Sequence, residues 1–151
     1  MNTHEIQVKV TTAMYELIRD SGVAAPVEVL MKIGALSKEN YELWRLGRVP
    51  YLEKICTVNL HKLSTIMREV RVYAKKHDLK GSWTMYKKWK SKGGKVIPLR
   101  FSKSGLEQIE REYATHYISA TKMAEAQERR DFHRMKNELA GTIAPCGNET
   151  E

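Results

Sequence analysis

The sequence feature that most constrains the fold is an apolar repeat over residues 60–74. Its large side chains recur every three or four positions, which is the spacing of one face of an α-helix. They are Leu60, Leu63, Ile66, Met67, Val70, Tyr73 and Ala74. Asn59 or Thr57 provides a capping side chain, and we expect the helix to continue to about His77. The repeat therefore predicts a long amphipathic helix in a mainly helical domain.

The first segment of the chain also has the pattern of an amphipathic helix. Asn2 and Glu5 form a capping-box signal at its start, and Gly22 fits a stop just beyond Ser21. Its apolar stripe comprises Ile6, Val10, Ala13, Met14, Leu17 and Ile18. We expect this helix to pack in the core and to have no contact role.

Two short helices with a tight glycine turn between them are predicted next. Pro26 suits the first turn of one helix, which ends before Gly34. Ser37 is able to cap the other, which we expect over residues 38–46. This arrangement is the plan of a helix-turn-helix unit.

The sequence of this region resembles that of a known class of DNA-binding domain. Gly34-Ala35-Leu36-Ser37, followed by Trp44-Arg45-Leu46-Gly47-Arg48-Val49-Pro50, is similar to the second half of repressor-type (Cro-like) or winged helix-turn-helix domains. The resemblance covers about residues 26–50. It departs from the pattern by one extra residue between the glycine and the tryptophan, and by Leu30 or Met31 in place of a small alanine.

The resemblance implies that the helix after Ser37 reads bases in the major groove. The side chains that it would turn toward the groove are Lys38, Asn40, Glu42 and Arg45. Asparagine pairs bidentately with adenine and arginine with guanine, whereas the carboxylates of Glu39 and Glu42 repel phosphate. The alternative is a helical hairpin that only builds the core. In that case Tyr41, Trp44 and Leu46 face inward.

Positive charge is concentrated between residues 49 and 103. This segment holds fourteen basic and three acidic side chains, whereas residues 1–48 hold six of each and residues 104–151 hold six basic and nine acidic. The net charge of the chain is +8. Because charge gathered in one segment repels itself in the folded state, we expect a polyanionic partner. The alternative is a solvated lysine-rich face without a partner.

Aromatic rings are interleaved with these charges at Tyr73, Trp83, Tyr86, Trp89 and Phe101. Cations attract phosphates, and flat rings can stack on bases, so this mixture favours a nucleic acid as the partner. Trp89 is flanked by lysines and is the better stacking candidate, while Trp83 is ambiguous between core and stacking roles. The residues predicted to bind nucleic acid are Lys38, Asn40, Arg45, Arg48, Arg71, Lys75, Lys76, Lys80, Lys87, Lys88, Trp89, Lys90, Lys92, Lys95, Arg100 and Lys103.

A basic β-hairpin is predicted over residues 82–102. Residues 82–89 and 96–101 have the pattern of strands, with a glycine turn at residues 91–94 between them. Ile97, Leu99 and Phe101 are expected to face inward, and Pro98 places the second strand at a sheet edge. Such a hairpin resembles the wing of winged-helix proteins. The alternative is a short hairpin whose lysines protect its edges from aggregation.

The last third of the chain predicts two helices. A capping-box signal at residues 104–107 opens the first, with Leu106, Ile109, Tyr113 and Tyr117 as its buried stripe. Residues 119–140 form a strongly charged helix with a sparse apolar stripe, which is typical of a helix that projects or pairs with another subunit. Residues 141–151 are expected to be disordered.

Several classes of function have no motif in this sequence. There is no phosphate loop, dinucleotide-binding glycine pattern or nucleophile elbow, so we expect no catalysis and no cofactor. Cys56 and His61 lack a second ligand pair, so no metal site is expected. A nuclease would have to use His77 with Asp78, or His116 with Glu112. No apolar run approaches membrane-spanning length, and two distant cysteines favour the cytoplasm.

Together these patterns predict a fold that is mainly α with one β-hairpin, helix-turn-helix- or winged-helix-like, with a C-terminal helical extension. Residues 1–118 would form the helical domain. The predicted function is non-catalytic nucleic-acid binding, with DNA favoured over RNA, in a transcriptional regulator or an accessory protein of a phage or mobile element. The alternatives are an RNA- or ribosome-binding protein, and an adaptor or homodimer that acts through residues 119–140.

Overall fold

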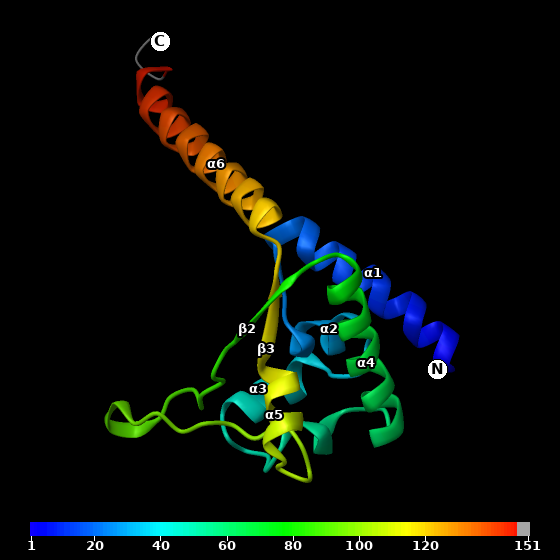
Figure 1. The fold of residues 1–151 in the computed structure, drawn as a ribbon. Helices are drawn as coiled ribbons and strands as arrows, with labels where there is room; N and C mark the ends of the chain where they lie inside the picture. The colour runs from blue at the N-terminus through cyan, green and yellow to red at the C-terminus, as the bar shows by residue number, and fades with distance from the viewer. Residues whose placement is uncertain (148–151) are drawn as a thin grey trace.

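The structure is a computed structural model that describes residues 1–147, and the side chains of residues 1–141. Within these residues the fold has six α-helices and a small antiparallel sheet of three strands, which confirms the prediction of a mainly helical fold (Figure 1). The helices are α1 (Thr3–Ser21), α2 (Pro26–Lys32), α3 (Lys38–Arg45), α4 (Leu60–Lys76), α5 (Glu107–Ala114) and α6 (Ala120–Gly147). The strands are β1 (Val23–Ala24), β2 (Lys80–Trp83) and β3 (Thr115–Ile118). Leu52–Ile55 and Lys92–Gly94 form the short 3-10 helices η1 and η2.

Side-chain caps start the first, third and fourth helices where the sequence predicts them. The Asn2 side chain accepts a hydrogen bond from the Glu5 backbone N–H at 2.9 Å, and Ser37 caps α3 in the same way. The Asn59 carboxamide accepts from the Lys62 N–H at 2.9 Å. Each cap satisfies a donor that has no partner inside its helix. The local sequence is therefore sufficient to set these helix starts.

The core lies between α1 and α4 and extends beneath α2 and α3. The apolar faces of α1 and α4 pack together, and the residues predicted as the α4 stripe are buried except Leu60. Trp44 of α3 is completely buried, and its indole N–H donates to the Arg100 carbonyl at 2.8 Å. Its ring packs against Tyr86 and Phe101, so α3 is joined to a segment more than forty residues later in the chain.

The sheet has the order β1-β3-β2, so its central strand comes last in the sequence. Val23 pairs with Ile118 on one side of β3, and Trp83 pairs with Thr115 on the other. The prediction of strands over residues 82–89 and 96–101 that pair with each other was wrong. Only Ser82 and Trp83 of that segment lie in a strand, and their partner is β3.

Residues 84–101, which we call the basic arm, replace the predicted hairpin ladder. The two limbs of the arm run antiparallel, but they share one bridge, between Lys87 and Pro98. The ladder stops there because Trp89 donates its N–H to the Arg45 carbonyl at 2.7 Å instead, and because Lys90 has a φ of 58°. The bridge itself is flanked by hydrogen bonds from the Lys88 N–H to the Ile97 carbonyl and from the Leu99 N–H to the Tyr86 carbonyl, so the missing N–H of Pro98 does not interrupt it. Figure 1 shows the arm extending from the helical body to the tip at η2.

The predicted inward face of this segment is present only in part. Phe101 is buried and Leu99 is half-buried, but Ile97 is exposed. A ladder of two full strands would have fixed the alternation of faces along the whole segment. Without it, only the residues nearest the body reach the core.

The predicted capping box at residues 104–107 is also wrong. Gly105 has a φ of 70°, and the Ser104 hydroxyl accepts from the Leu106 N–H within a turn, so α5 begins at Glu107 without a side-chain cap. Leu106 is exposed, and Tyr117 belongs to β3. The buried part of the predicted stripe is therefore limited to Tyr113 and, partly, Ile109.

The helix α6 leaves the body at the end of α1 and points away from it (Figure 1). Its first turns are attached, since Ala126 is buried and the Arg129 guanidinium donates to the Arg19 carbonyl at 3.1 Å. The predicted projecting segment 119–140 lies almost wholly in α6. The predicted disordered segment 141–151 overlaps the last turns of this helix, and its residues 148–151 lie outside the described residues.

Candidate nucleic-acid interface

Helix α3 places its predicted base-reading residues in different surroundings. Lys38 and Arg48 are exposed. Asn40 is half-buried, and its side-chain amide donates to the Ile55 carbonyl at 3.3 Å. An asparagine that reads adenine needs this amide free. The structure therefore leaves Lys38 and Arg48 available on this side of the molecule and engages Asn40 within the fold.

Arg45 is enclosed by aromatic rings from α3 and the basic arm. Its guanidinium carbon lies 4.7 Å from the Trp89 ring centroid, 5.2 Å from that of Tyr86 and 5.9 Å from that of Tyr41. One terminal nitrogen donates to the Tyr41 hydroxyl at 3.2 Å, and the buried Nε has no hydrogen-bond partner among the described residues. Such cation–π contacts stabilise a planar guanidinium. Arg45 is thus a link between α3 and the arm.

The lysines of the basic arm are its most accessible charges. Lys87, Lys90, Lys92 and Lys95 are exposed and form no ion pair with any residue that the structure describes. Lys88 is half-buried, and its side chain lies against Gly47. Helix α6, whose sequence contains five basic and four acidic residues, points away from the arm (Figure 1). The arm is therefore a projecting cationic segment that no described acid neutralises.

The remaining predicted cations fall into two other groups. Lys75, Lys76 and Lys80 are exposed around the connection from α4 to β2, at the opposite end of β2 from the arm. Arg71 is paired with Glu112 at 3.2 Å. Near the base of the arm Lys103 is exposed, while Arg100 donates to the carbonyls of Ser102 and Lys103 and lies over the Tyr51 ring. The structure brings together the arm lysines but keeps Arg71 and Arg100 in internal contacts.

The two tryptophans of this region, Trp83 and Trp89, have different surroundings. Trp89, the predicted stacking residue, is 38% exposed and packs edge-on against Tyr41 and over Arg45. Trp83 is 58% exposed, and no described ring or cation stacks on it. The feature that could have indicated the exposure of Trp83 is its position, because Trp83 ends a strand at a sheet edge. The preference for Trp89 as the stacking residue rested on its flanking lysines, and the structure leaves Trp89 less exposed than Trp83.

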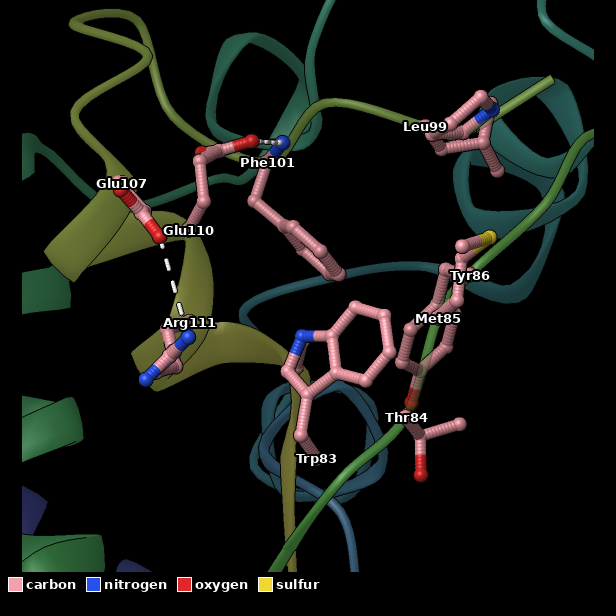
Figure 2. Close-up of a pocket in the computed structure, with 11 residues that line it drawn as sticks. Trp83, Thr84, Met85, Tyr86, Leu99, Phe101, Glu107, Glu110 and Arg111 are labelled. Atoms are coloured by element: carbon pink, nitrogen blue, oxygen red, sulfur yellow. Dashed lines mark hydrogen bonds and ion pairs between the residues drawn. The ribbon is translucent and has the colours of Figure 1, made fainter.

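Trp83 lines a cavity of about 360 Å³ at the base of the arm (Figure 2). Phe101, Leu99 and Ala114 contribute apolar walls, and Met85 and Tyr86 line the side formed by the arm. Figure 2 shows the Trp83 indole pointing toward Phe101, with Arg111 on one side and Tyr86 on the other. The cavity therefore joins an exposed ring to the two limbs of the cationic arm.

The acidic side chains at this cavity are already engaged. Glu110 accepts hydrogen bonds from the Phe101 N–H at 2.8 Å, from the Ser102 N–H at 2.7 Å and from the Ser102 hydroxyl at 2.6 Å. Glu107 forms an exposed ion pair with Arg111 at 3.8 Å. Hydrogen bonds of this kind stabilise and partly neutralise a carboxylate. An anionic ligand at the rim would therefore meet Arg111 together with a partly compensated Glu107.

The groups considered for a nuclease serve other contacts. The His116 ring lies 2.9 Å from the Tyr86 hydroxyl, and burial lowers its pKa below the usual 6.5. Glu112 is paired with Arg71, and the His77 ring stacks on Tyr73. In the described part of the chain, no three His, Cys, Asp or Glu side chains gather as a metal ion would require.

Cys56 is a partly buried thiol beside η1. Its Sγ lies 3.5 Å from the Leu52 carbonyl, and burial, with the nearby Glu53 carboxylate, raises the pKa of the thiol to about 12. A thiol with so high a pKa carries almost no thiolate at neutral pH and is a poor nucleophile. The side chain acts as part of the packing around Leu52.

None of the described helices combines the length and the apolar character needed to cross a membrane. Comparisons with protein-family models, with curated proteins and with solved structures find no match for this chain.

Proposed function

We propose that the protein binds nucleic acid without catalysing a reaction, and that the basic arm is the main contact surface. The observation that carries this proposal is the row of exposed arm lysines that pair with no described acid. Held together on a projecting segment, these charges repel one another, and a polyanion relieves that repulsion. Counterion release from the phosphates would supply most of the affinity.

DNA is proposed ahead of RNA because of the arrangement of α2 and α3. The two helices are joined by a turn in which Gly34 has a φ of 82°, and Ser37 caps the second helix; a short glycine turn between two helices supports a helix-turn-helix reading. The arm would then take the place of a wing. Since Asn40 and Arg45 are engaged within the fold, Lys38 and Arg48 would contact phosphates, and sequence selectivity would be weak.

The experiment is a binding assay on duplex DNA, single-stranded DNA and folded RNA over a series of salt concentrations. Replacing Lys87, Lys88, Lys90 and Lys92 together by glutamine should reduce the slope of log affinity against log salt by up to about 3–4 units on duplex DNA, if all four contact phosphates.

A matched control replaces Lys9, Lys32, Lys122 and Lys136 by glutamine. This variant loses the same net charge from α1, α2 and α6 and should keep the wild-type slope. Equal slopes in the wild-type protein and in the arm variant would remove the arm from the interface. Equal reductions of the slope in the arm variant and in the control variant would show that the protein attracts nucleic acid through its net charge alone.

A second candidate function is recognition of a protein partner, or of a second copy of the chain, through α6. Phe132, Met135 and Leu139 are all more than half exposed and recur at helical spacing. The sparse stripe is too short to account for a stable coiled coil by itself. Replacing Phe132 by glutamate should abolish any concentration-dependent association seen by sedimentation, while leaving binding to nucleic acid unchanged.

A further inference from the structure

We propose that the cavity at the base of the basic arm receives an unpaired base of a single nucleic-acid strand. This inference rests on the proposed function, because the arm would hold the phosphates of the same strand. The proposed interface would then bind phosphates through its lysines and one base through a stacking site.

The first argument is the exposed ring of Trp83. Among the three tryptophans, Trp44 is completely buried and Trp89 is occupied by Arg45 and Tyr41, whereas Trp83 is 58% exposed at the cavity. Its indole N–H has no hydrogen-bond partner among the described residues. The exposed ring is therefore available to stack on a ligand. A base offers both a flat face for stacking and acceptors for the free N–H.

The second argument is the size and lining of the cavity. A volume of about 360 Å³ is near the lower end of the range for small-molecule sites, so it suits one base better than a larger cofactor. Phe101, Leu99 and Ala114 provide an apolar wall. Thr84 and Arg111 are polar lining residues able to bond the edge of a base (Figure 2). Duplex DNA keeps its bases stacked inside the helix, so an unpaired base is required.

The third argument is the continuity between the cavity and the cations. Met85 and Tyr86 line the cavity, and Lys87 and Lys88 follow directly on the same limb. In an extended chain Lys87 is about 7 Å beyond Met85. Arg111 stands at the rim on the α5 side. A strand with one base in the cavity would therefore have phosphates beside the arm lysines in one direction and beside Arg111, which is paired with Glu107 at 3.8 Å, in the other.

The test compares the full-length protein with its Trp83→Ala variant on fluorescent strands of about 12 nucleotides. One strand is oligothymidine, one is oligouridine, and one is an abasic strand of equal length with the same phosphates. Loss of base stacking should weaken binding of the variant to oligothymidine about 5- to 150-fold and leave its binding to the abasic strand nearly unchanged. Oligouridine shows whether the site also accepts RNA.

Two further variants complete the experiment. Trp83→Tyr should restore most of the affinity, because it keeps a stacking ring. Val8→Ala removes an exposed apolar side chain from α1, outside the arm and the cavity, and should have no effect. Thermal unfolding followed by circular dichroism checks that each variant folds.

The outcomes separate this proposal from the proposed function. Wild-type affinity of Trp83→Ala for oligothymidine, with loss of binding in the arm-lysine variant, would overturn the base site and leave the proposed function standing. Equal losses on the abasic strand and on oligothymidine would also overturn the base site. Absence of binding by the wild-type protein to every strand, duplex and folded RNA at low salt would overturn both.

Discussion

At Gly22 the chain turns between α1 and β1 while the backbone of α6 passes directly beside it. A Cβ atom at this position would lie 2.3 Å from the Met123 nitrogen and 2.4 Å from its Cα. Gly34 has nearly the same positive φ, 82° against 79°, but has no atom within 4 Å of such a Cβ. The two glycines thus share a backbone requirement and differ in packing.

This contrast gives a matched pair of substitutions. Gly34→Ala is expected to lower the free energy of unfolding by about 1 kcal/mol, the cost of a left-handed alanine. Gly22→Ala adds a clash with the α6 backbone and should cost about 2–4 kcal/mol. Urea unfolding measures both. Equal losses would mean that α6 does not hold its place beside α1 in solution.

His116 supports a prediction about pH. Because burial lowers its pKa below 6.5, the unfolded chain binds the proton more readily than the folded protein. The stabilisation from neutral His116 is therefore fully present above about pH 6.5 and declines as the pH falls below that value. Unfolding free energies at about pH 7.5 and about pH 5 should differ more in the wild type than in His116→Gln. The same difference in the wild type and in His116→Gln would exclude His116 as a source of the pH dependence of stability.

Local chemistry makes some residues predictable and others not. Asn2, Ser37 and Asn59 cap helices as expected, because a cap depends on the few residues that follow it. The surroundings of Arg45 and Trp83 depend on segments tens of residues away, and no local pattern reports them. The sequence therefore identified the cationic character of the candidate site, but it left the role of Trp83 undecided between core and stacking.

At the scale of elements, the basic arm shows why the predicted hairpin was wrong. Alternation and a glycine turn identified two antiparallel limbs but could not show that β3 competes for residues 80–83. Beyond β2, the Trp89 N–H donates to the Arg45 carbonyl and not to the opposite limb of the arm. Strand pairing depends on long-range partners more than helix formation does, so the helices were predicted better than the sheet.

The contact between Arg45 and Trp89 should restrain the basic arm. Removing the ring by Trp89→Ala eliminates a cation–π contact, and cleavage by trypsin within the arm should become about 2- to 30-fold faster, since the open form is more populated. The cleavage sites themselves are retained, because the arm lysines are unchanged. Val96→Ala serves as the control. Unaltered cleavage in Trp89→Ala would show that the arm is held by other contacts.

At the scale of the whole molecule, the contacts that the described side chains of α6 form with the body come from its first turns. Met123, Ala126 and Arg129 contact the end of α1, whereas Phe132, Met135 and Leu139 are exposed. The sequence predicted this projection from a sparse stripe. Its point of attachment was not predictable, because it depends on a glycine at the far end of α1.

Two truncations test this arrangement. Deleting residues 132–151 should change the free energy of unfolding by less than about 0.5 kcal/mol, because the described side chains of this part, residues 132–141, are exposed. Deleting residues 120–151 removes the buried Ala126 and should destabilise the body measurably. Chemical denaturation of both proteins gives the comparison. A large loss in the shorter deletion would show that the end of α6 packs on the body.

The sheet order has a consequence for how the protein is made. Both outer strands, β1 and β2, leave the ribosome before β3, and neither can pair until β3 emerges between them. For that interval two backbone edges stay open to neighbouring chains, a recognised route to aggregation during synthesis. Closure of the sheet is thus a late event in the life of each nascent polypeptide.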